Sequence, residues 1–199
     1  MESGSLSLGL EAPHFELPEP LTGRKVSLDD SKGAKAILVC FICNHCPFVI
    51  HLERAIVEMV EHFKTQGLAT FAISANSMIT HPQDGPEKMA EKAESLGYPF
   101  PYLYDESQEM AKAYGAVCTP EFYVFDANRS LAYHGRFDES TPRNGKPITG
   151  DDLRDALEDI LAGRPVQRPM RNSIGCGIKW HPETRFKRNH SEEQSWCRW

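Results

Sequence analysis

The first strong pattern along the chain is an apolar run followed by an amphipathic one. Residues 35–42 (KAILVCFI) are apolar after the first lysine and rich in branched side chains, which predicts a short buried strand. Over 45–65, apolar residues recur every three or four positions with charged residues between them, which predicts an amphipathic helix. Residues 68–74 (LATFAIS) predict a second buried strand. This is a β-α-β unit, so we expect parallel strands and a right-handed crossover.

Weaker patterns predict the remaining elements. In chain order these are an N-terminal β-hairpin around Thr22-Gly23, a helix over 86–95, a strand over 101–104, a helix through Tyr114 opened by an Asp105–Gln108 capping pair, an antiparallel hairpin of 121–126 with 130–136, and a last helix between Thr149 and Gly163. Residues 138–148 have the composition of a loop. We therefore expect one domain over 8–163. An irregular C-terminal extension over 164–199 should be partly packed to about residue 180, through Ile174, Ile178 and Trp180, and loosely ordered beyond it.

Composition and charge narrow the classes of function. The chain has 199 residues, of which 40% are apolar and 25% charged, which suits a single α/β domain. Residues 1–163 hold 14 basic and 25 acidic residues, whereas 164–199 hold 8 and 3, so the body is acidic and repels phosphate backbones. We expect no nucleic-acid partner.

The sequence also bears on location. No run approaches the roughly 18 to 20 apolar residues that a membrane-spanning helix needs. The first residues (MESGSLSLGLEAPHFEL) lack the basic and apolar regions of an export signal. We therefore expect a cytoplasmic protein without membrane contact.

Six cysteines allow either the disulfide framework of a small exported protein or a cluster of functional thiols. The framework does not fit, because Cys40, Cys43 and Cys46 lie within seven residues. A chain of 199 residues can also bury enough core to fold without disulfides. The clustering favours redox chemistry or metal binding.

The motif Cys43-Asn44-His45-Cys46-Pro47 lies between the predicted strand and helix. There, free backbone N–H groups and the helix dipole should favour a thiolate on Cys43. We predict that Cys43 is the attacking nucleophile and that Cys46 resolves the mixed disulfide. A protonated His45 would stabilise a thiolate, although it could equally face solvent without a role. The two cysteines could also be half of a zinc knuckle, but such a site needs a second ligand pair. The sequence offers none, so we predict no metal.

The order of elements resembles the thioredoxin-like superfamily, in the redoxin branch that includes alkyl hydroperoxide reductase/thiol-specific antioxidant proteins. The motifs that carry this resemblance are FICNHCPFV, FPYLYDESQ, AYGAVCTPEFYVFD and SIGCGIKW. It covers roughly residues 8–180. It implies an α/β thioredoxin-like fold with a mixed central sheet flanked by helices. It also implies that Pro120 is cis and, with Thr119, packs against the two cysteines and helps to present the substrate backbone.

The chain departs from the patterns of that superfamily. Cys40 takes the place of the buried acid of thioredoxin, so a general-base carboxylate is not evident. Ile42 replaces the tryptophan before the first cysteine, which weakens the case for reduction by a standard thioredoxin reductase. Neither Cys43 nor Cys46 stands in the P-x-x-x-T-x-x-C arrangement of peroxiredoxins.

The other cysteines have several possible roles. Cys118, two positions before Pro120, could exchange with the CxxC pair, bind metal or simply pack. Cys176 lies between two glycines and could approach another surface as a resolving thiol. We expect Cys40 to be a packed apolar side chain and Cys197 to be incidental.

Together these observations predict a thiol–disulfide oxidoreductase. It would exchange a Cys43–Cys46 dithiol with protein or small-molecule disulfides and would receive electrons from another thiol system, without an organic cofactor. The alternatives are a thiol-dependent peroxidase and a copper- or zinc-binding protein with Cys118 or a histidine as third ligand. A thioredoxin-like interaction domain without catalysis is disfavoured, because both cysteines are present.

Overall fold

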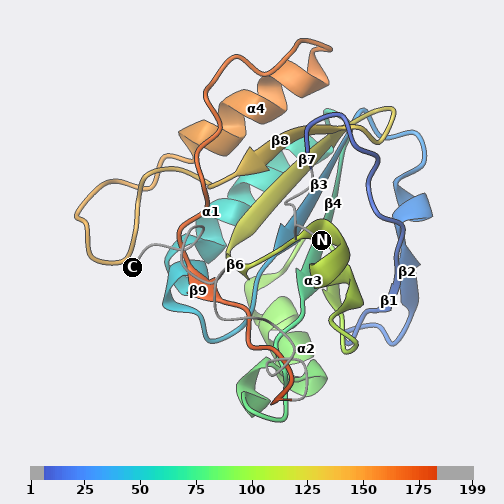
Figure 1. The fold of residues 1–199 in the computed structure, drawn as a ribbon, viewed down its shortest axis with the longest axis vertical. Coiled ribbons are helices and arrows are strands. Elements are labelled where there is room, and N and C mark those ends of the chain that lie inside the picture. Colours follow the sequence, from blue (N-terminus) through green and yellow to red (C-terminus); the bar gives the residue numbers. More distant parts are fainter. Residues whose placement is uncertain (1–6, 183–199) are drawn as a thin grey trace.

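The apolar run around residue 38 forms the central strand of a five-stranded sheet (Figure 1). The computed structural model describes residues 7–182. In it, β3 (Ala36–Phe41) pairs in parallel with β4 (Leu68–Ser74) and antiparallel with β7 (Glu121–Asp126). The strand order is β5-β4-β3-β7-β8, with β5 parallel to β4 and β8 antiparallel to β7. The predicted α/β thioredoxin-like fold with a mixed central sheet is confirmed.

The other elements follow the predicted order. They are β1 (Glu16–Pro18), β2 (Lys25–Ser27), a 3-10 turn η1 (Leu28–Ser31), α1 (Pro47–Lys64), η2 (Pro82–Asp84), α2 (Pro86–Leu96), β5 (Tyr102–Tyr104), α3 (Glu109–Tyr114), β6 (Cys118–Thr119), β8 (Leu131–Gly135), α4 (Asp151–Leu161) and β9 (Cys176–Gly177). Strands β1 and β2 form the expected N-terminal hairpin.

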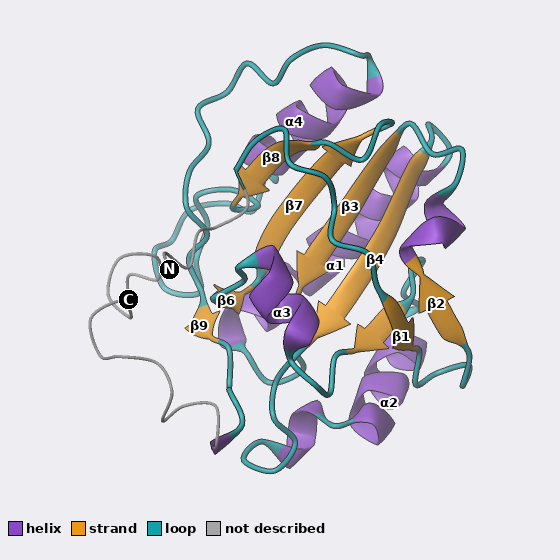
Figure 2. Cartoon of the chain, turned by 45° about the vertical axis from the view of Figure 1, so that its right-hand side comes forward, coloured by secondary structure: helices purple, strands orange, loops and turns teal. Residues whose placement is uncertain are grey.

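Alternation along β3 divides the core between the two faces of the sheet. Leu38 and Cys40 point to the face covered by α1 and α4, whereas Ile37 and Val39 point to the face covered by α3 and the N-terminal segment (Figure 2). All six residues of β3 are buried. The strand is therefore a rigid support for the loop that follows it.

Helix α1 begins at Pro47, two residues later than the periodicity predicts. The residue before a proline avoids helical dihedrals, and Cys46 is extended at φ −65° and ψ 120°. Proline itself suits the first helical position. Cys46 is therefore the residue that caps α1, and it lies outside the helix.

The predicted capping pair ahead of α3 is wrong in its second member. Helix α3 begins at Glu109, and the Asp105 carboxylate accepts the Ala111 amide hydrogen at 2.9 Å. Gln108, with φ at 62°, instead sends its side-chain amide to the carbonyl oxygens of Ala75 and Lys179. The Gln108 side chain therefore contacts the C-terminal segment and does not cap α3.

The C-terminal extension packs against the domain. Ile178 is buried and Trp180 packs on the same cluster, while β9 pairs with β6. The predicted loosely ordered segment beyond residue 182 and Cys197 lie outside the described residues. Within residues 7–182, the helices are too short or too polar to cross a membrane.

Candidate active site

Two segments that are far apart in sequence bring Cys43, Cys46 and Thr119 together. Cys43 follows β3, Cys46 caps α1, and Thr119 ends β6. The Cys43 Sγ lies 3.4 Å from the Thr119 hydroxyl oxygen, and the Cys46 Sγ lies 3.1 Å from the Thr119 carbonyl oxygen. The Thr119–Pro120 peptide bond is cis. Pro47 is the first residue of α1.

Both CxxC side chains are shielded from solvent. Cys43 is 1% exposed and Cys46 is 0% exposed. Direct attack on either sulfur by a large substrate therefore requires the covering segments to move.

A buried carboxylate that the sequence analysis did not find lies beside the CxxC loop. Asp84, at the end of η2, is 0% exposed and accepts the amide hydrogens of Asn44 and His45 at 2.8 and 3.1 Å. The Asn76 side-chain amide donates to its other oxygen at 2.9 Å. No general-base carboxylate is evident in the sequence, and the structure adds a buried carboxylate that binds the backbone of the CxxC loop. Asp84 comes from the HPQDGP turn, which carries no periodic pattern that could have placed it.

His45 faces Asp84 as well as solvent. Its Nδ1 lies 2.5 Å from Asp84 Oδ2, its side chain is 24% exposed, and its ring stacks on His81 with centroids 4.9 Å apart. The Asn44 side chain donates to the Gln83 carbonyl oxygen at 2.9 Å. Both residues between the cysteines are thus held by the η2 turn.

The surroundings of Cys43 disfavour its thiolate. The hydrogen bond with Cys46, then burial and the nearby Asp84 charge, raise the pKa of Cys43 above its ordinary value of 9.0. The neighbouring amides that the sequence argument left free are bound to Asp84. The prediction of a thiolate on Cys43 is therefore wrong for this structure.

The surroundings of Cys46 favour its thiolate. The hydrogen bond from Cys43, with others from Thr119, the Val49 amide and the Cys176 thiol, outweighs burial and lowers the pKa of Cys46 to about 4. The Val49 amide belongs to the first turn of α1, where N–H groups lack helical partners. Negative charge in the pair therefore lies on Cys46.

Cys176 is the accessory thiol that the structure brings to the CxxC pair. It lies in β9, directly opposite Thr119 in the antiparallel pairing with β6. Its side chain is half-buried and packs against the core cluster that includes Cys43 and Cys46. Cys176 also helps to lower the pKa of Cys46. Three sulfurs thus form one cluster.

The Cys118 thiol lies beside the carboxylate of Glu121. Its thiol is 4.0 Å from a carboxylate oxygen of the buried Glu121, whose other oxygen lies 2.7 Å from the His134 ring. Glu121 also accepts the amide hydrogens of Val117 and Cys118. These contacts fix the turn before Pro120 and give Cys118 a packed position.

Cys40 is packed in the core, as expected. Its thiol donates to the Phe71 carbonyl oxygen at 3.7 Å, and burial raises its pKa to about 12. It therefore stays protonated and unreactive in the folded protein.

The donor atoms of Cys43, His45 and Asp84 lie within 4.8 Å of one another, so they are a possible metal set. Thiolate, imidazole and carboxylate together suit zinc. However, His45 Nδ1 and Asp84 Oδ2 are hydrogen-bonded to each other, and Asp84 is also committed to two backbone amides. A metal would have to break this network. Cys118, which the sequence suggested as a third ligand, is not in this set.

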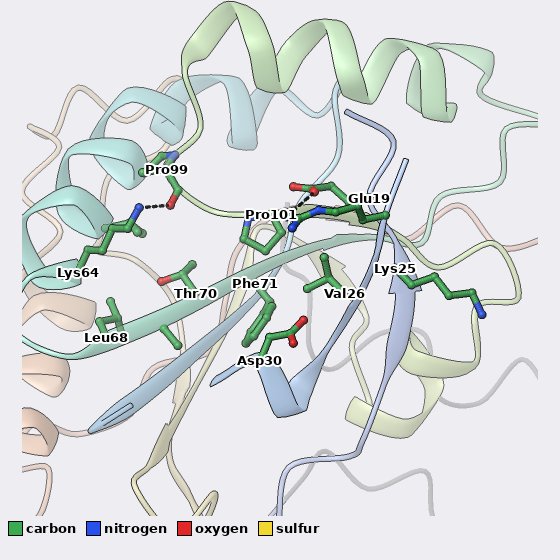
Figure 3. A pocket seen from close by; sticks show the side chains of 13 residues that line it. Glu19, Lys25, Val26, Asp30, Lys64, Leu68, Thr70, Phe71, Pro99 and Pro101 are labelled. Carbon is green, nitrogen blue, oxygen red and sulfur yellow. Dashed lines mark hydrogen bonds and ion pairs between the residues drawn. The ribbon is translucent and has the colours of Figure 1, made fainter. Parts of the chain in front are cut away.

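A pocket among the described residues lies away from the cysteines. Its volume is about 510 Å³, and its walls include Lys64, Leu68 and Pro99 (Figure 3). Lys64 is the last residue of α1 and Leu68 is the first of β4, whereas the cysteines lie at the amino end of α1. The pocket is separate from the thiol cluster.

Comparison with known proteins identifies the family of this chain. Residues 8–134 match the AhpC/TSA family, and the chain belongs to that family. A crystal structure of an uncharacterised protein from Geobacillus kaustophilus has 48% sequence identity and a TM-score of 0.86, and the match covers 88% of this chain and 93% of that one.

Two further relatives carry names that describe a function. A Mycobacterium tuberculosis protein provisionally named a peroxiredoxin is 30% identical over 59% of this chain and 69% of its own length. The thiol-disulfide oxidoreductase ResA of Geobacillus thermodenitrificans is 26% identical over 80% of this chain and 81% of its own. The chain is thus a redoxin with a thioredoxin-like fold, in an oxidoreductase family.

Proposed function

We propose that this chain is a thiol–disulfide oxidoreductase whose reacting pair is Cys43 and Cys46. The observation that carries the proposal is that Thr119 contacts both sulfurs at the amino end of α1: the Cys43 Sγ lies 3.4 Å from its hydroxyl oxygen, and the Cys46 Sγ lies 3.1 Å from its carbonyl oxygen. Two residues between the cysteines allow their disulfide to close as a small ring. The similarity to ResA supports the same class.

The electron balance of this exchange is simple. A thiolate attacks a substrate disulfide, forms a mixed disulfide and releases one thiol. The remaining cysteine attacks the protein sulfur of that mixed disulfide, closes the Cys43–Cys46 bond and releases the second thiol. Because the surroundings of Cys46 favour its thiolate, the two product thiols take up the proton of Cys43 and one proton from solvent. A separate thiol donor reverses these steps and restores the dithiol.

Asp84 serves this chemistry as a positioning residue. It binds the amides of Asn44 and His45, so the turn between the cysteines keeps its shape while the sulfurs change oxidation state. A protonated His45 would neutralise the Asp84 charge next to Cys43. This ion pair would weaken the repulsion between the Asp84 carboxylate and a thiolate on Cys43.

The partners are part of the proposal. They are a protein or small molecule that bears a disulfide and a thiol system that donates electrons, both in the cytoplasm and without nucleic acid or membrane. The cysteine spacing and the acidic body of the chain support this assignment.

A thiol-dependent peroxidase is the second candidate. The Thr119 hydroxyl, 3.4 Å from the Cys43 sulfur, supplies the type of group that the missing P-x-x-x-T-x-x-C motif would provide. The relative named as a peroxiredoxin favours the same reaction. Here one peroxide oxygen would be transferred to the thiolate sulfur as a sulfenic acid, and the other would leave as water or an alcohol. Attack by the second cysteine would then close the disulfide and release the transferred oxygen as water.

Steady-state assays with oxidised glutathione, insulin and hydrogen peroxide separate the two candidates. We expect Cys43→Ser and Cys46→Ser to lose disulfide reduction by on the order of 100-fold or more. Cys40→Ala, which removes a buried thiol outside the cluster, should retain it. Disulfide reduction that survives both serine changes would overturn the proposal. Peroxide turnover much faster than disulfide turnover would establish the peroxidase instead.

A further inference from the structure

The C-terminal segment closes over the CxxC pair as an added strand. Thr119 of β6 pairs with Cys176 of β9, and Cys118 pairs with Gly177 (Figure 1). Figure 2 shows the chain returning from α4 to place β9 beside β6. A segment about 57 residues further along the chain therefore occupies the backbone edge that adjoins the reacting sulfurs.

Gly175 permits this close approach. A Cβ atom at this position would lie 2.0 Å from the Thr119 carbonyl oxygen and 2.6 Å from its carbon. Both are backbone atoms that cannot move aside without displacing the strand. Residue 175 therefore has to be glycine for β9 to dock.

The segment is anchored on both sides of Cys176. Before it, the Ser173 hydroxyl donates to the Gly135 carbonyl oxygen at 2.7 Å. After it, the Lys179 amide donates to the Asn76 side chain at 2.8 Å, and Ile178 is buried in the core. These contacts hold the Cys176 sulfur in a defined place.

The three sulfurs form a path from solvent to the interior. Cys176 is half-buried, Cys46 lies next to it at 0% exposure, and Cys43 follows at 1% exposure. Cys176 stands directly opposite Thr119, whose carbonyl oxygen lies 3.1 Å from the Cys46 Sγ, and it packs against the core cluster that includes Cys43 and Cys46. This placement brings the three sulfurs to one region of the fold, where thiol–disulfide exchange can pass between them.

We propose that Cys176 is a third redox-active cysteine, through which low-molecular-weight disulfides exchange with the buried Cys43–Cys46 pair. The inference rests on the proposed function. An extended polypeptide substrate would need the Thr119 backbone edge, which β9 already occupies. A small disulfide needs only the sulfur of Cys176.

The relay balances in atoms and electrons. The Cys176 thiol attacks the substrate disulfide RSSR as its thiolate, gives Cys176–S–S–R and releases RS⁻, which takes up the proton that Cys176 has lost. The Cys46 thiolate attacks the Cys176 sulfur, forms the Cys46–Cys176 disulfide and releases a second RS⁻, which takes a proton from solvent. Cys43 then attacks the Cys46 sulfur, closes the Cys43–Cys46 disulfide and passes its proton to Cys176. The dithiol has lost two electrons, and RSSR has gained them.

Trapping each step tests the relay. Reduced variants are mixed with oxidised glutathione, released glutathione is counted, and the bonded cysteines are identified by peptide mass mapping. In Cys46→Ser we expect one glutathione released and the other bound to Cys176. In Cys43→Ser we expect two released and a Cys46–Cys176 disulfide. Cys176→Ser should react roughly tenfold or more slowly than the parent chain.

The opposite results separate the two proposals. Glutathione bound to Cys43 in Cys46→Ser, or a parent-like rate in Cys176→Ser, would overturn the relay and leave the proposed function intact. Steady-state disulfide turnover at the parent rate by both Cys43→Ser and Cys46→Ser would overturn the proposed function itself. Thermal unfolding of each variant shows whether it keeps the fold. The disulfide that Cys43→Ser forms is identified by mass mapping, so this result does not depend on how fast the variant reacts.

Discussion

Asp84 Oδ2 lies 2.5 Å from His45 Nδ1, while the other carboxylate oxygen of Asp84 accepts the His45 amide hydrogen. One buried acid thus fixes both the backbone and the ring of the residue that precedes Cys46. This relationship makes η2, a turn outside the CxxC motif, part of the redox site.

Replacing the carboxylate should change stability and ionisation together. In Asp84→Asn, loss of the charge-assisted bonds should lower the free energy of unfolding by about 1–3 kcal/mol, which urea denaturation measures. Because the Asp84 charge helps to raise the pKa of Cys43, that pKa should fall. Glu87→Gln, an exposed change in the next helix, is the matched control. Unchanged stability and thiol titration would show that the network has no effect.

The location of the thiolate can be measured by titration. In the reduced parent chain, thiolate absorbance should rise as pH passes through about 4, because the pKa of Cys46 lies there and not at 9.0. Cys43→Ser should keep this step, since a serine hydroxyl can still donate to Cys46. Cys46→Ser should lose it. A low step that persists in Cys46→Ser and vanishes in Cys43→Ser would place the thiolate on Cys43.

Gly175→Ala should release β9, since its new Cβ would meet the Thr119 backbone. We expect faster alkylation of Cys43 and Cys46, faster reduction of insulin relative to oxidised glutathione, and a loss of about 1–3 kcal/mol in stability. Gly145→Ala is a comparison in which no heavy atom lies within 4 Å of the added Cβ, although its φ of +68° carries its own local strain. Parent-like alkylation in Gly175→Ala would contradict the docked strand.

Cys40 should resist modification in the native protein. Its pKa of about 12 and its complete burial leave almost no accessible thiolate at neutral pH. Mass mapping after brief alkylation should find Cys40 labelled only once denaturant unfolds the chain. Labelling of Cys40 as fast as that of Cys176 under native conditions would show that the core opens readily.

Local patterns were sufficient to predict the framework of this fold. The apolar run of β3, the three-to-four-residue period of α1 and the run of β4 each depend on neighbouring residues, so the β-α-β unit could be predicted. Element ends were less predictable. Pro47 delays α1, and Gln108 bonds to Lys179 across the fold.

The candidate site was predictable only where the residues are consecutive. The CxxC motif is local, and Thr119 entered through the family resemblance. Asp84 and the pairing of Cys176 with Thr119 depend on contacts between segments 40 or more residues apart, which no periodic pattern encodes. The ionisation of the pair depends on those same contacts, which oppose the thiolate that the sequence predicts on Cys43.

The most direct test of the central claim is a disulfide map of the parent chain. The reduced protein is mixed with one equivalent of oxidised glutathione, quenched with acid and digested. Our account predicts a Cys43–Cys46 disulfide and two molecules of reduced glutathione per chain. Cys43 and Cys46 that both remain thiols after the glutathione is consumed would contradict it.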